Sequence, residues 1–366
     1  MIKILQYIGS LDFGGSQAFI MEVYRKINKE EIQFDFITFP NEKNGFYDEI
    51  LKLGGKVYEA PKFNGKNGIE FIKWWNNFFK QHKEYKILHG HVRSCASLYV
   101  PIAKKNSVKT IVHSHSTSNG KGVEGIVKKI LQFPIRYQAD YLFACSSIAG
   151  EWLFGKKALK KDNYYMINNC IDVEKYRYNS EIRNQMRKEL GLENKIVYGH
   201  VGRLIDAKNH MFLLEVFKEI YIKNNNSVLI IVGDGELKEE IKNKIELLNL
   251  QGAVLMLGSR NDVEKLMQAM DILLFPSKWE GLPVTVVEAQ AAGLPCFISD
   301  TITTDIDISK AVYYLPIDKG TDIWVDKINV CLKNRMDVIE DIKQAGFDIN
   351  GSVIRLEELY KNIYEL

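Results

Sequence analysis

The sequence is poor in the residues that mark secreted, zinc-bound and membrane-spanning proteins. Its 366 residues include five cysteines, which are scattered, odd in number and without a Cys-x-x-Cys pair. Such a set argues against a disulfide framework and against a zinc site. No window reaches the roughly 18 uninterrupted apolar residues of a membrane span. The apolar stretch at residues 1–9 is too short for a signal peptide, so we expect a cytoplasmic protein with reduced thiols.

The net charge is small over the whole chain, but the first half has a large positive excess and the second half a negative one. The net charge is +3, yet residues 1–178 contain 27 Lys and Arg against 17 Asp and Glu, and the remainder contains 22 against 29. A basic half predicts an anionic partner, such as nucleic acid, an anionic membrane or a phosphorylated acceptor. Solvated lysines on helix surfaces explain the excess equally well, so charge alone does not choose among these.

Short apolar runs alternate with longer amphipathic segments along the whole chain. This alternation is typical of βαβ units around a parallel sheet, and the length exceeds what one hydrophobic core usually supports. We therefore expect an α/β chain of two Rossmann-like, doubly wound domains that face a cleft. The expected parts are an N-terminal domain (1–178), a C-terminal domain (179–351) and a last helix (352–366) able to pack back on the first domain, with strands at 3–8, 34–39, 86–91, 110–115, 141–145, 196–201, 228–232, 254–256, 272–275, 295–298 and 312–315.

The most informative segment contains two glutamates with seven residues between them. A buried strand at 272–275 is followed by a Gly/Pro loop with Glu280, and a helix starts near Val284. Free amides of such a loop and helix N-terminus suit a phosphate or sugar hydroxyls. Glu288 lies one helical turn after Val284, so both carboxylates can accept hydrogen bonds from hydroxyls. A loop charge and a helix-surface residue are the simpler interpretation, but this helix is apolar nearly all round, where an unpaired carboxylate is costly.

Basic residues and glycine turns follow other strands of the second half. Arg203 and Lys208 come after strand 196–201 and could neutralise the charge that develops on a departing diphosphate, or form an ordinary exposed loop. Gly233 belongs to a Gly-x-Gly turn, whose simpler role is a tight turn from a strand to a helix. Arg260 lies in a loop whose backbone could face a nucleobase, and Asp262 is expected to cap the next helix.

Together these residues resemble the retaining glycosyltransferases of family 4, which have the two-domain GT-B fold. The most specific mark is the Glu-x7-Glu element formed by Glu280 and Glu288. The resemblance implies that Glu280 contacts the transferred sugar, that Glu288 binds the ribose, and that Arg203 and Lys208 hold the diphosphate. It further implies a donor site that includes Gly233, Arg260, Gly281, Leu282, Pro283, Val284 and Thr285.

The first half offers a glycine loop and histidines at strand ends. Gly14 and Gly15 follow the first strand and let backbone approach a ligand closely, and the resemblance places this loop beside the donor phosphate and the acceptor. The family also has a histidine near the reacting sugar, after the strand that here ends in His113 and His115. We assign that role to His115, the nearer to the loop, with His113 as the alternative.

Two further histidines, His89 and His91, lie on the preceding strand and are secondary candidates. Paired histidines suggest a metal site, but no carboxylate or cysteine stands at a suitable spacing. The sequence therefore predicts no metal. One departure from the family lies at Cys170, where the family often has glycine.

Two segments combine apolar, aromatic and basic residues, at 71–80 and 127–131. They predict either ordinary core packing or a surface that rests on an anionic membrane, where a lipid-linked acceptor would be presented.

The resemblance implies the transfer, with retention, of a hexose or N-acetylhexosamine from a nucleotide diphosphate sugar. It further implies a UDP-sugar as the donor and, as the acceptor, a glycan or lipid-linked glycan of bacterial capsule or exopolysaccharide synthesis. No metal, cofactor or nucleic acid is expected, since Arg203, Lys208 and helix amides would supply the positive charge. The alternatives are a sugar-nucleotide epimerase or phosphorylase on the same fold, and a non-catalytic nucleotide-sugar sensor or partner subunit. A dinucleotide-binding dehydrogenase is disfavoured because residues 9–15 lack the Gly-x-Gly-x-x-Gly spacing.

Overall fold

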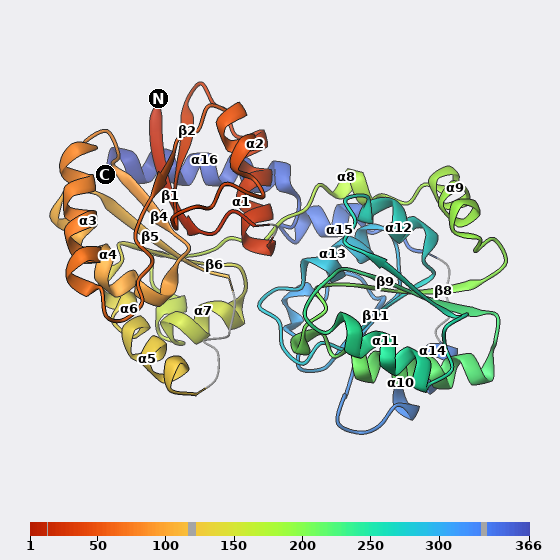
Figure 1. The fold of residues 1–366 in the computed structure, drawn as a ribbon. Helices are drawn as coiled ribbons and strands as arrows, with labels where there is room; N and C mark the ends of the chain where they lie inside the picture. The colour runs from red at the N-terminus through yellow and green to blue at the C-terminus, as the bar shows by residue number, and fades with distance from the viewer. Residues whose placement is uncertain (13, 116–121, 331–334) are drawn as a thin grey trace. The chain divides into compact units, whose positions relative to one another are not determined.

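The computed structural model describes residues 1–12, 14–115, 122–330 and 335–366. Phe13, in the expected glycine loop, and Cys331 lie outside the described residues. The chain divides into two compact units (Figure 1). Unit 1 comprises Met1–Cys170 together with Ile349–Leu366, and unit 2 comprises Ile171–Asp348. Among the described helices, none is both long enough and apolar enough to cross a membrane.

Unit 1 is built on a parallel sheet in the order β3-β2-β1-β4-β5-β6-β7. Its inner strands are largely buried on both faces, and polar side chains such as Gln6, Asp35 and His113 are buried among the apolar ones. The edge strands β3 and β7 were not expected from the sequence, because each has only three residues. The strands are β1 (Ile2–Gly9), β2 (Ile32–Thr38), β3 (Val57–Glu59), β4 (Ile87–Gly90), β5 (Lys109–Ser114), β6 (Tyr141–Ala144) and β7 (Tyr164–Met166).

Helices cover both faces of this sheet, and the last helix of the chain is among them. The expected single helix at 124–137 is two helices, α5 and α6, that are interrupted near Pro134. The helices are α1 (Gly15–Lys26), α2 (Tyr47–Lys52), α3 (Gly68–Gln81), α4 (Ala96–Lys105), α5 (Gly122–Gln132), α6 (Ile135–Gln138), α7 (Ser147–Phe154) and α16 (Ile349–Glu365), with 3-10 turns at Arg93–Cys95 and Ala158–Lys160.

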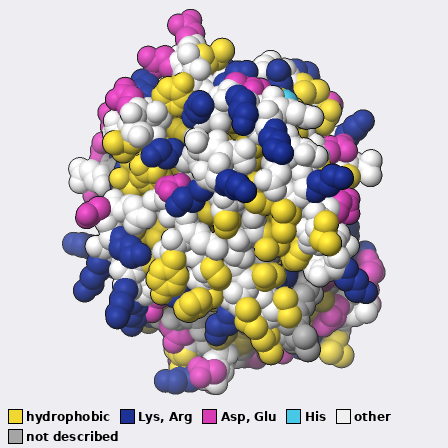
Figure 2. Space-filling view, turned by 90° about the vertical axis from the view of Figure 1, so that its left-hand side faces the viewer, with side chains coloured by type: hydrophobic (Ala, Val, Ile, Leu, Met, Phe, Trp, Pro, Cys, Tyr) yellow, Lys and Arg dark blue, Asp and Glu magenta, His cyan; other side chains and the backbone are white. Residues whose placement is uncertain are grey.

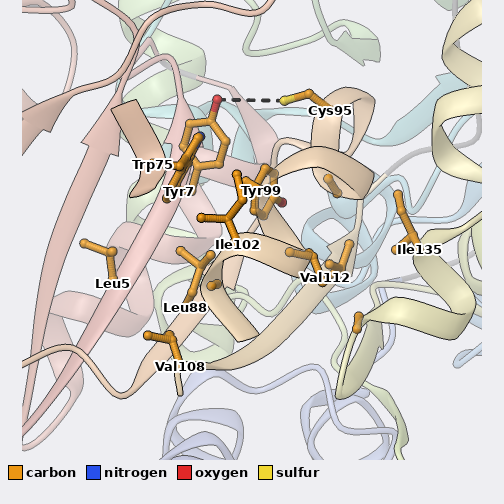
Figure 3. Packing of buried hydrophobic residues seen from close by; sticks show 14 of the residues in the cluster. Leu5, Tyr7, Trp75, Leu88, Cys95, Tyr99, Ile102, Val108, Val112 and Ile135 are labelled. Carbon is orange, nitrogen blue, oxygen red and sulfur yellow. Dashed lines mark hydrogen bonds between the residues drawn. The ribbon is translucent and has the colours of Figure 1, made fainter. Parts of the chain in front are cut away.

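The aromatic residues of α3 belong to the core of unit 1. Trp75 is fully buried against Tyr7 of β1, with ring centroids 5.1 Å apart, and stacks on Tyr99 of α4 (Figure 3). Tyr7 Oη lies 4.0 Å from Cys95 Sγ in the same cluster. Of the two interpretations of residues 71–80, core packing is therefore the one that the structure supports. Phe71, Trp75, Phe78 and Phe79 of this segment are buried and so are not available to a membrane surface.

Unit 2 contains a second parallel sheet, in the order β10-β9-β8-β11-β12-β13. Its strands are β8 (Ile196–Val201), β9 (Ser227–Val232), β10 (Val254–Gly258), β11 (Ile272–Phe275), β12 (Cys296–Ser299) and β13 (Val312–Leu315). Its helices are α8 (Val173–Tyr176), α9 (Ser180–Leu190), α10 (His210–Lys223), α11 (Lys238–Leu247), α12 (Val263–Ala269), α13 (Val284–Ala291), α14 (Asp322–Val330) and α15 (Ile339–Gln344), with 3-10 turns at Asp206–Lys208 and Thr304–Ile306.

The strand order of each sheet reverses once along the chain. The reversal lies between β1 and β4 in unit 1 and between β8 and β11 in unit 2. In open parallel sheets, ligands bind beyond the carboxyl ends of the strands at such a switch point. The fold therefore directs attention to the loops that follow these four strands.

The chain passes from unit 1 to unit 2 after Cys170, rather than after residue 178 as expected from the sequence. The reason is that α8 already packs against α12, α13 and α15 of unit 2. Ile171 also pairs with Asp348 in a parallel bridge. Cys170 is not among the described residues with positive φ, so the turn does not require the glycine that the resembled family has there.

Candidate active site

The loops after β8 and β11 are joined at the switch point of unit 2. Lys208 Nζ lies 2.6 Å from Glu280 Oε1, and each side chain is only 15% exposed. The same ammonium lies 4.5 Å from the ring centroid of Phe275, the last residue of β11. Between the loops, the Lys278 N–H donates to the Ala207 carbonyl over 2.8 Å. A cation suited to phosphate and a carboxylate suited to sugar hydroxyls thus lie side by side.

Helix α13 begins directly after this loop. Pro283 is its N-cap residue, no described side chain caps it, and its first turn contains no acidic residue. Among the described residues, neither a side-chain cap nor a carboxylate of the first turn neutralises the positive end of the helix, which suits an anion site. The remaining residues expected in the donor site surround this start: Leu282 and Pro283 are buried, and Gly281, Val284 and Thr285 are partly exposed.

Gly233 allows the loops after β8 and β9 to touch. Its φ is +140°, and a Cβ at this position would lie 2.0 Å from the carbonyl oxygen of Gly202. Backbone hydrogen bonds join the same loops, from Gly202 to Val232 over 2.9 Å and from Leu204 to Asp234 over 3.0 Å. This packing fixes the backbone on both sides of Arg203. A direct contact of Gly233 with a ligand stays a prediction.

We expect Gly233→Ala to destabilise the protein by about 3 kcal/mol, because the new Cβ would clash with backbone that cannot rotate away. Urea denaturation of the full chain measures this. Gly252→Ala is the matched control, since a Cβ there would meet nothing within 4 Å. Equal stability of the two variants would contradict the packing role of Gly233.

The two arginines expected in the donor site differ in their surroundings. Arg203 is exposed and forms no ion pair with any described residue, so it is available to an anion. Arg260 forms a two-pronged pair with Asp262, with N–O distances of 2.8 and 2.6 Å. Asp262 is the N-cap residue of α12, as expected, but its side chain makes no cap hydrogen bond and pairs with Arg260 instead. A charged, two-pronged pair is stronger than one hydrogen bond from a neutral amide.

Glu288 has a partner that the sequence did not reveal. Tyr176 of α8 donates a hydrogen bond of 2.7 Å to Glu288 Oε1. Burial raises the pKa of Glu288, and the Tyr176 hydrogen bond and the charge of Lys175 oppose this in part. Tyr176 stands 112 residues before Glu288, so only the folded structure brings them together. This partly buried carboxylate, which accepts one hydrogen bond from Tyr176, suits a partner that donates hydroxyls.

In unit 1, the glycine loop and His115 lie at the same edge of the sheet. Gly14 is the N-cap residue of α1, without a side-chain cap, and a Cβ on Gly15 would meet nothing within 4 Å. Phe19 of α1 lies 6.4 Å from the His115 ring, centroid to centroid. The open backbone after β1 and the histidine after β5 are therefore neighbours.

The structure distinguishes the histidines by exposure. His113 is fully buried within β5, whereas His115, just after the strand, is partly exposed. Burial, reinforced by Arg93, lowers the pKa of His115 to about 3, so this imidazole is neutral near pH 7. Exposure favours His115 over His113 as the group that meets a ligand, and the catalytic role stays a prediction.

Two residues near His115 escaped the sequence analysis. Arg93, whose guanidinium lies 4.6 Å from the Trp152 ring centroid, acts on the His115 pKa. The Asn169 side chain raises the pKa of His115, which opposes in part the lowering by burial. Arg93 stands two residues after His91, a candidate strand-end histidine, and that position was the signal available in the sequence.

Comparisons with known proteins found family matches in both halves of the chain. Residues 13–175 match the family described as "Glycosyltransferase Family 4", and residues 182–345 match "Glycosyl transferases group 1". The chain is 30% identical to the putative glycosyltransferase EpsF of Bacillus subtilis, over 98% of this chain and 96% of that protein.

Other relatives and a solved structure extend the likeness. The chain is 32% identical to an Escherichia coli UDP-Gal:α-D-GlcNAc-diphosphoundecaprenol α-1,3-galactosyltransferase, over 78% of this chain and 76% of that protein. It is 24% identical to the capsular polysaccharide biosynthesis glycosyltransferase CapH of Staphylococcus aureus, over 98% and 99%. Anabaena HepE, solved with UDP-glucose, is similar in fold, with a TM-score of 0.78 at 18% identity, over 99% of this chain and all of that one.

Proposed function

Because this chain belongs to glycosyltransferase family 4 and has the GT-B fold, we propose that it transfers a hexose or N-acetylhexosamine, with retention, from a UDP-sugar to a glycan or lipid-linked acceptor. That it is a glycosyltransferase related to enzymes of capsular and exopolysaccharide synthesis follows from the relatives. The observation that supports the finer proposal most is the Lys208–Glu280 pair beside the uncapped start of α13.

The chemistry follows from the charges of these groups. In the reaction, the bond from the anomeric carbon to the diphosphate oxygen breaks, and a bond to the acceptor oxygen forms on the same face. The acceptor proton passes to the departing phosphate oxygen. Lys208, Arg203 and the α13 N-terminus stabilise the negative charge that grows on the diphosphate, and Glu280 accepts hydrogen bonds from sugar hydroxyls. These groups supply the positive charge that a metal ion supplies in other transferases, and we propose a metal-independent reaction on that ground.

The choice of uridine rests on relatives, one named for UDP-Gal and one solved with UDP-glucose. The test is a panel of UDP-, GDP- and ADP-sugars, assayed in EDTA for binding and for slow hydrolysis. We expect one UDP-sugar to bind and turn over. Turnover that needs a divalent ion would overturn metal independence, and binding without turnover under any condition would favour the sensor.

A lipid-linked acceptor requires a place on the membrane surface, and the region of α5 and α6 offers one. These two helices and the segment between them expose Ile126, Val127, Ile130, Phe133 and Tyr137. Lys128, Lys129 and Arg136 lie between these residues in the sequence. Figure 2 shows hydrophobic side chains gathered in the lower part of this face of unit 1, with Lys and Arg around them. Exposed apolar side chains flanked by cations suit an anionic bilayer.

We expect Ile130→Asp to weaken co-sedimentation with phosphatidylglycerol vesicles by more than about tenfold, since it replaces an apolar contact with a charge that the lipids repel. Ile222→Asp is the matched control, because Ile222 in unit 2 is 63% exposed against 67% for Ile130. Binding that ignores the anionic lipid content, or that both variants lose equally, would contradict the proposed surface.

A further inference from the structure

Six side chains of unit 1 form one hydrogen-bonded network near the carboxyl ends of its central strands. The network contains four imidazoles, and burial is the largest cause that lowers the pKa of each. Each imidazole is therefore neutral and has one donor and one acceptor nitrogen. The members are Gln6 of β1, His89 and His91 on and after β4, His113 and His115 on and after β5, and Tyr360 of α16.

Gln6 connects the two branches of the network. Along the first branch, its Oε1 lies 2.9 Å from His91 Nε2, and His91 Nδ1 lies 2.8 Å from His115 Nε2. His115 Nδ1 is then left without a hydrogen bond of good geometry within the described residues. The first branch thus ends at an unused nitrogen of the histidine that we expect to meet a ligand.

The second branch starts at the other end of the same carboxamide. Gln6 Nε2 lies 3.4 Å from Tyr360 Oη, which lies 2.7 Å from His89 Nδ1. His89 Nε2 lies 3.2 Å from His113 Nδ1. Within the described residues, His113 Nε2 makes no further hydrogen bond of good geometry. Every inner nitrogen of both branches is used once.

If every inner group, Tyr360 included, donates on one side and accepts on the other, two arrangements of protons fit. In one, Gln6 Oε1 accepts from His91 Nε2, which makes His91 Nδ1 an acceptor and places the His115 proton on Nε2. In the same arrangement, Gln6 Nε2 donates to Tyr360, Tyr360 to His89, and His89 to His113, whose proton is on Nε2. The opposite arrangement turns the Gln6 carboxamide over and reverses every bond.

The orientation of the Gln6 carboxamide distinguishes the two. Its Oε1 faces His91 Nε2, and its Nε2 faces Tyr360 Oη. An amide oxygen can only accept, so His91 donates through Nε2 and His115 has its proton on Nε2. Asn169 beside His115 can donate through its amide, which is compatible with this arrangement.

The ring geometry argues against a metal at this cluster, although nitrogens of His89, His91 and His113 lie within 4.8 Å of one another. The His89 and His91 rings are 4.3 Å apart and tilted by only 30°. An ion must lie in the plane of each ring that binds it, about 2.0–2.1 Å from the nitrogen. Planes of rings stacked in this way do not meet that close to both nitrogens.

We propose that Gln6 and Tyr360 are positioning residues that hold His115 with its proton on Nε2, so that Nδ1 is the acceptor nitrogen of this ring. His115 Nδ1 is itself buried, and its use by a sugar or acceptor hydroxyl rests on the proposed function. The tautomer itself does not. A tyrosine near the end of the chain thereby determines which hydrogen bond a strand-end histidine of the same unit can make.

Long-range proton–nitrogen NMR of the imidazoles in the full-length protein tests the tautomers without any substrate. We expect His115 and His113 to be protonated on Nε2. Tyr360→Phe should shift the nitrogen signals of all four histidines, because Gln6 is then free to turn over. Tyr24→Phe is the matched control: it removes a hydroxyl from the same core, bonded to the Leu53 carbonyl, and should leave the four histidines unchanged.

Three outcomes would overturn the proposal: a wild-type His115 with its proton on Nδ1, an effect of Tyr360→Phe on His89 alone, or stoichiometric Zn²⁺ binding that shifts the histidine signals. In turnover, Tyr360→Phe should lower kcat by about tenfold with the donor KM unchanged, since a hydrogen bond is misdirected and the nucleotide contacts remain. Expected tautomers in a wild-type protein without turnover would support the network and contradict the proposed function, so the two failures are distinguishable.

Discussion

Replacing Lys208 with methionine is expected to lower kcat by about 10²–10³-fold, the usual cost of one group that stabilises developing negative charge. Methionine keeps the length of the side chain and its contact with Phe275 but removes the ammonium. Rates with a saturating nucleotide sugar measure the effect. Lys278→Met is the matched control, because Lys278 lies in the neighbouring loop and pairs instead with Asp206.

A loss of stability must be separated from the loss of charge. Lys208→Met leaves the Glu280 carboxylate, only 15% exposed, without its partner, and an unpaired charge in such a place destabilises the fold. The double variant Lys208→Met/Glu280→Gln removes the unpaired negative charge as well. We expect it to recover the melting temperature and not the activity. Recovery of activity would show that Lys208 serves only to neutralise Glu280.

Glu288→Gln is expected to weaken donor binding by about 10–100-fold while leaving the protein at least as stable near pH 7. The carboxylate accepts charged hydrogen bonds from hydroxyls, which are worth about 1.5–3 kcal/mol. Glutamine still accepts from Tyr176, so the fold keeps that contact. Calorimetric titration with the nucleotide sugar and thermal unfolding without it measure the two effects.

The sign of the stability effect follows from burial. The pKa of Glu288 is raised in the folded protein, so the folded state holds this proton more tightly than the unfolded state does. Stability is then lost as the pH rises from the unfolded pKa through the folded one. Glu288→Gln removes that loss. Glu264→Gln, at a neighbouring carboxylate paired with Lys175, is the control and should keep donor affinity. A destabilised Glu288→Gln would indicate a structural role.

The sequence was sufficient to predict the features that depend on residues close together in the chain. The apolar strand runs, and the loop and helix that hold Glu280 and Glu288, are set by neighbours within a few residues. Strands β3 and β7 were missed because three residues are too few to show the alternation of apolar and polar side chains that predicts a strand. The aromatic residues of α3 were ambiguous for a related reason: the same apolar pattern suits a core and a bilayer.

Other features depend on residues far apart in the chain. The Asp262 side chain was expected to cap a helix, whereas it forms an ion pair with Arg260, and that pair depends on the geometry of the folded loop. Tyr176 reaches Glu288 across 112 residues, and Gln6 reaches Tyr360 across 354. No spacing rule predicts such pairs, because they form only when the sheet order brings the elements together.

The return of α16 to unit 1 has a consequence for biosynthesis. Ile349, Val353, Leu356, Tyr360 and Ile363 complete a core whose other members come from the first 170 residues. Domains usually fold in the order in which they leave the ribosome. Here the unit made first must wait for residues 349–366, which are translated after unit 2, with part of its apolar core uncovered meanwhile. Nascent chains that stop at residue 348 should therefore engage chaperones through unit 1, although unit 2 is already whole.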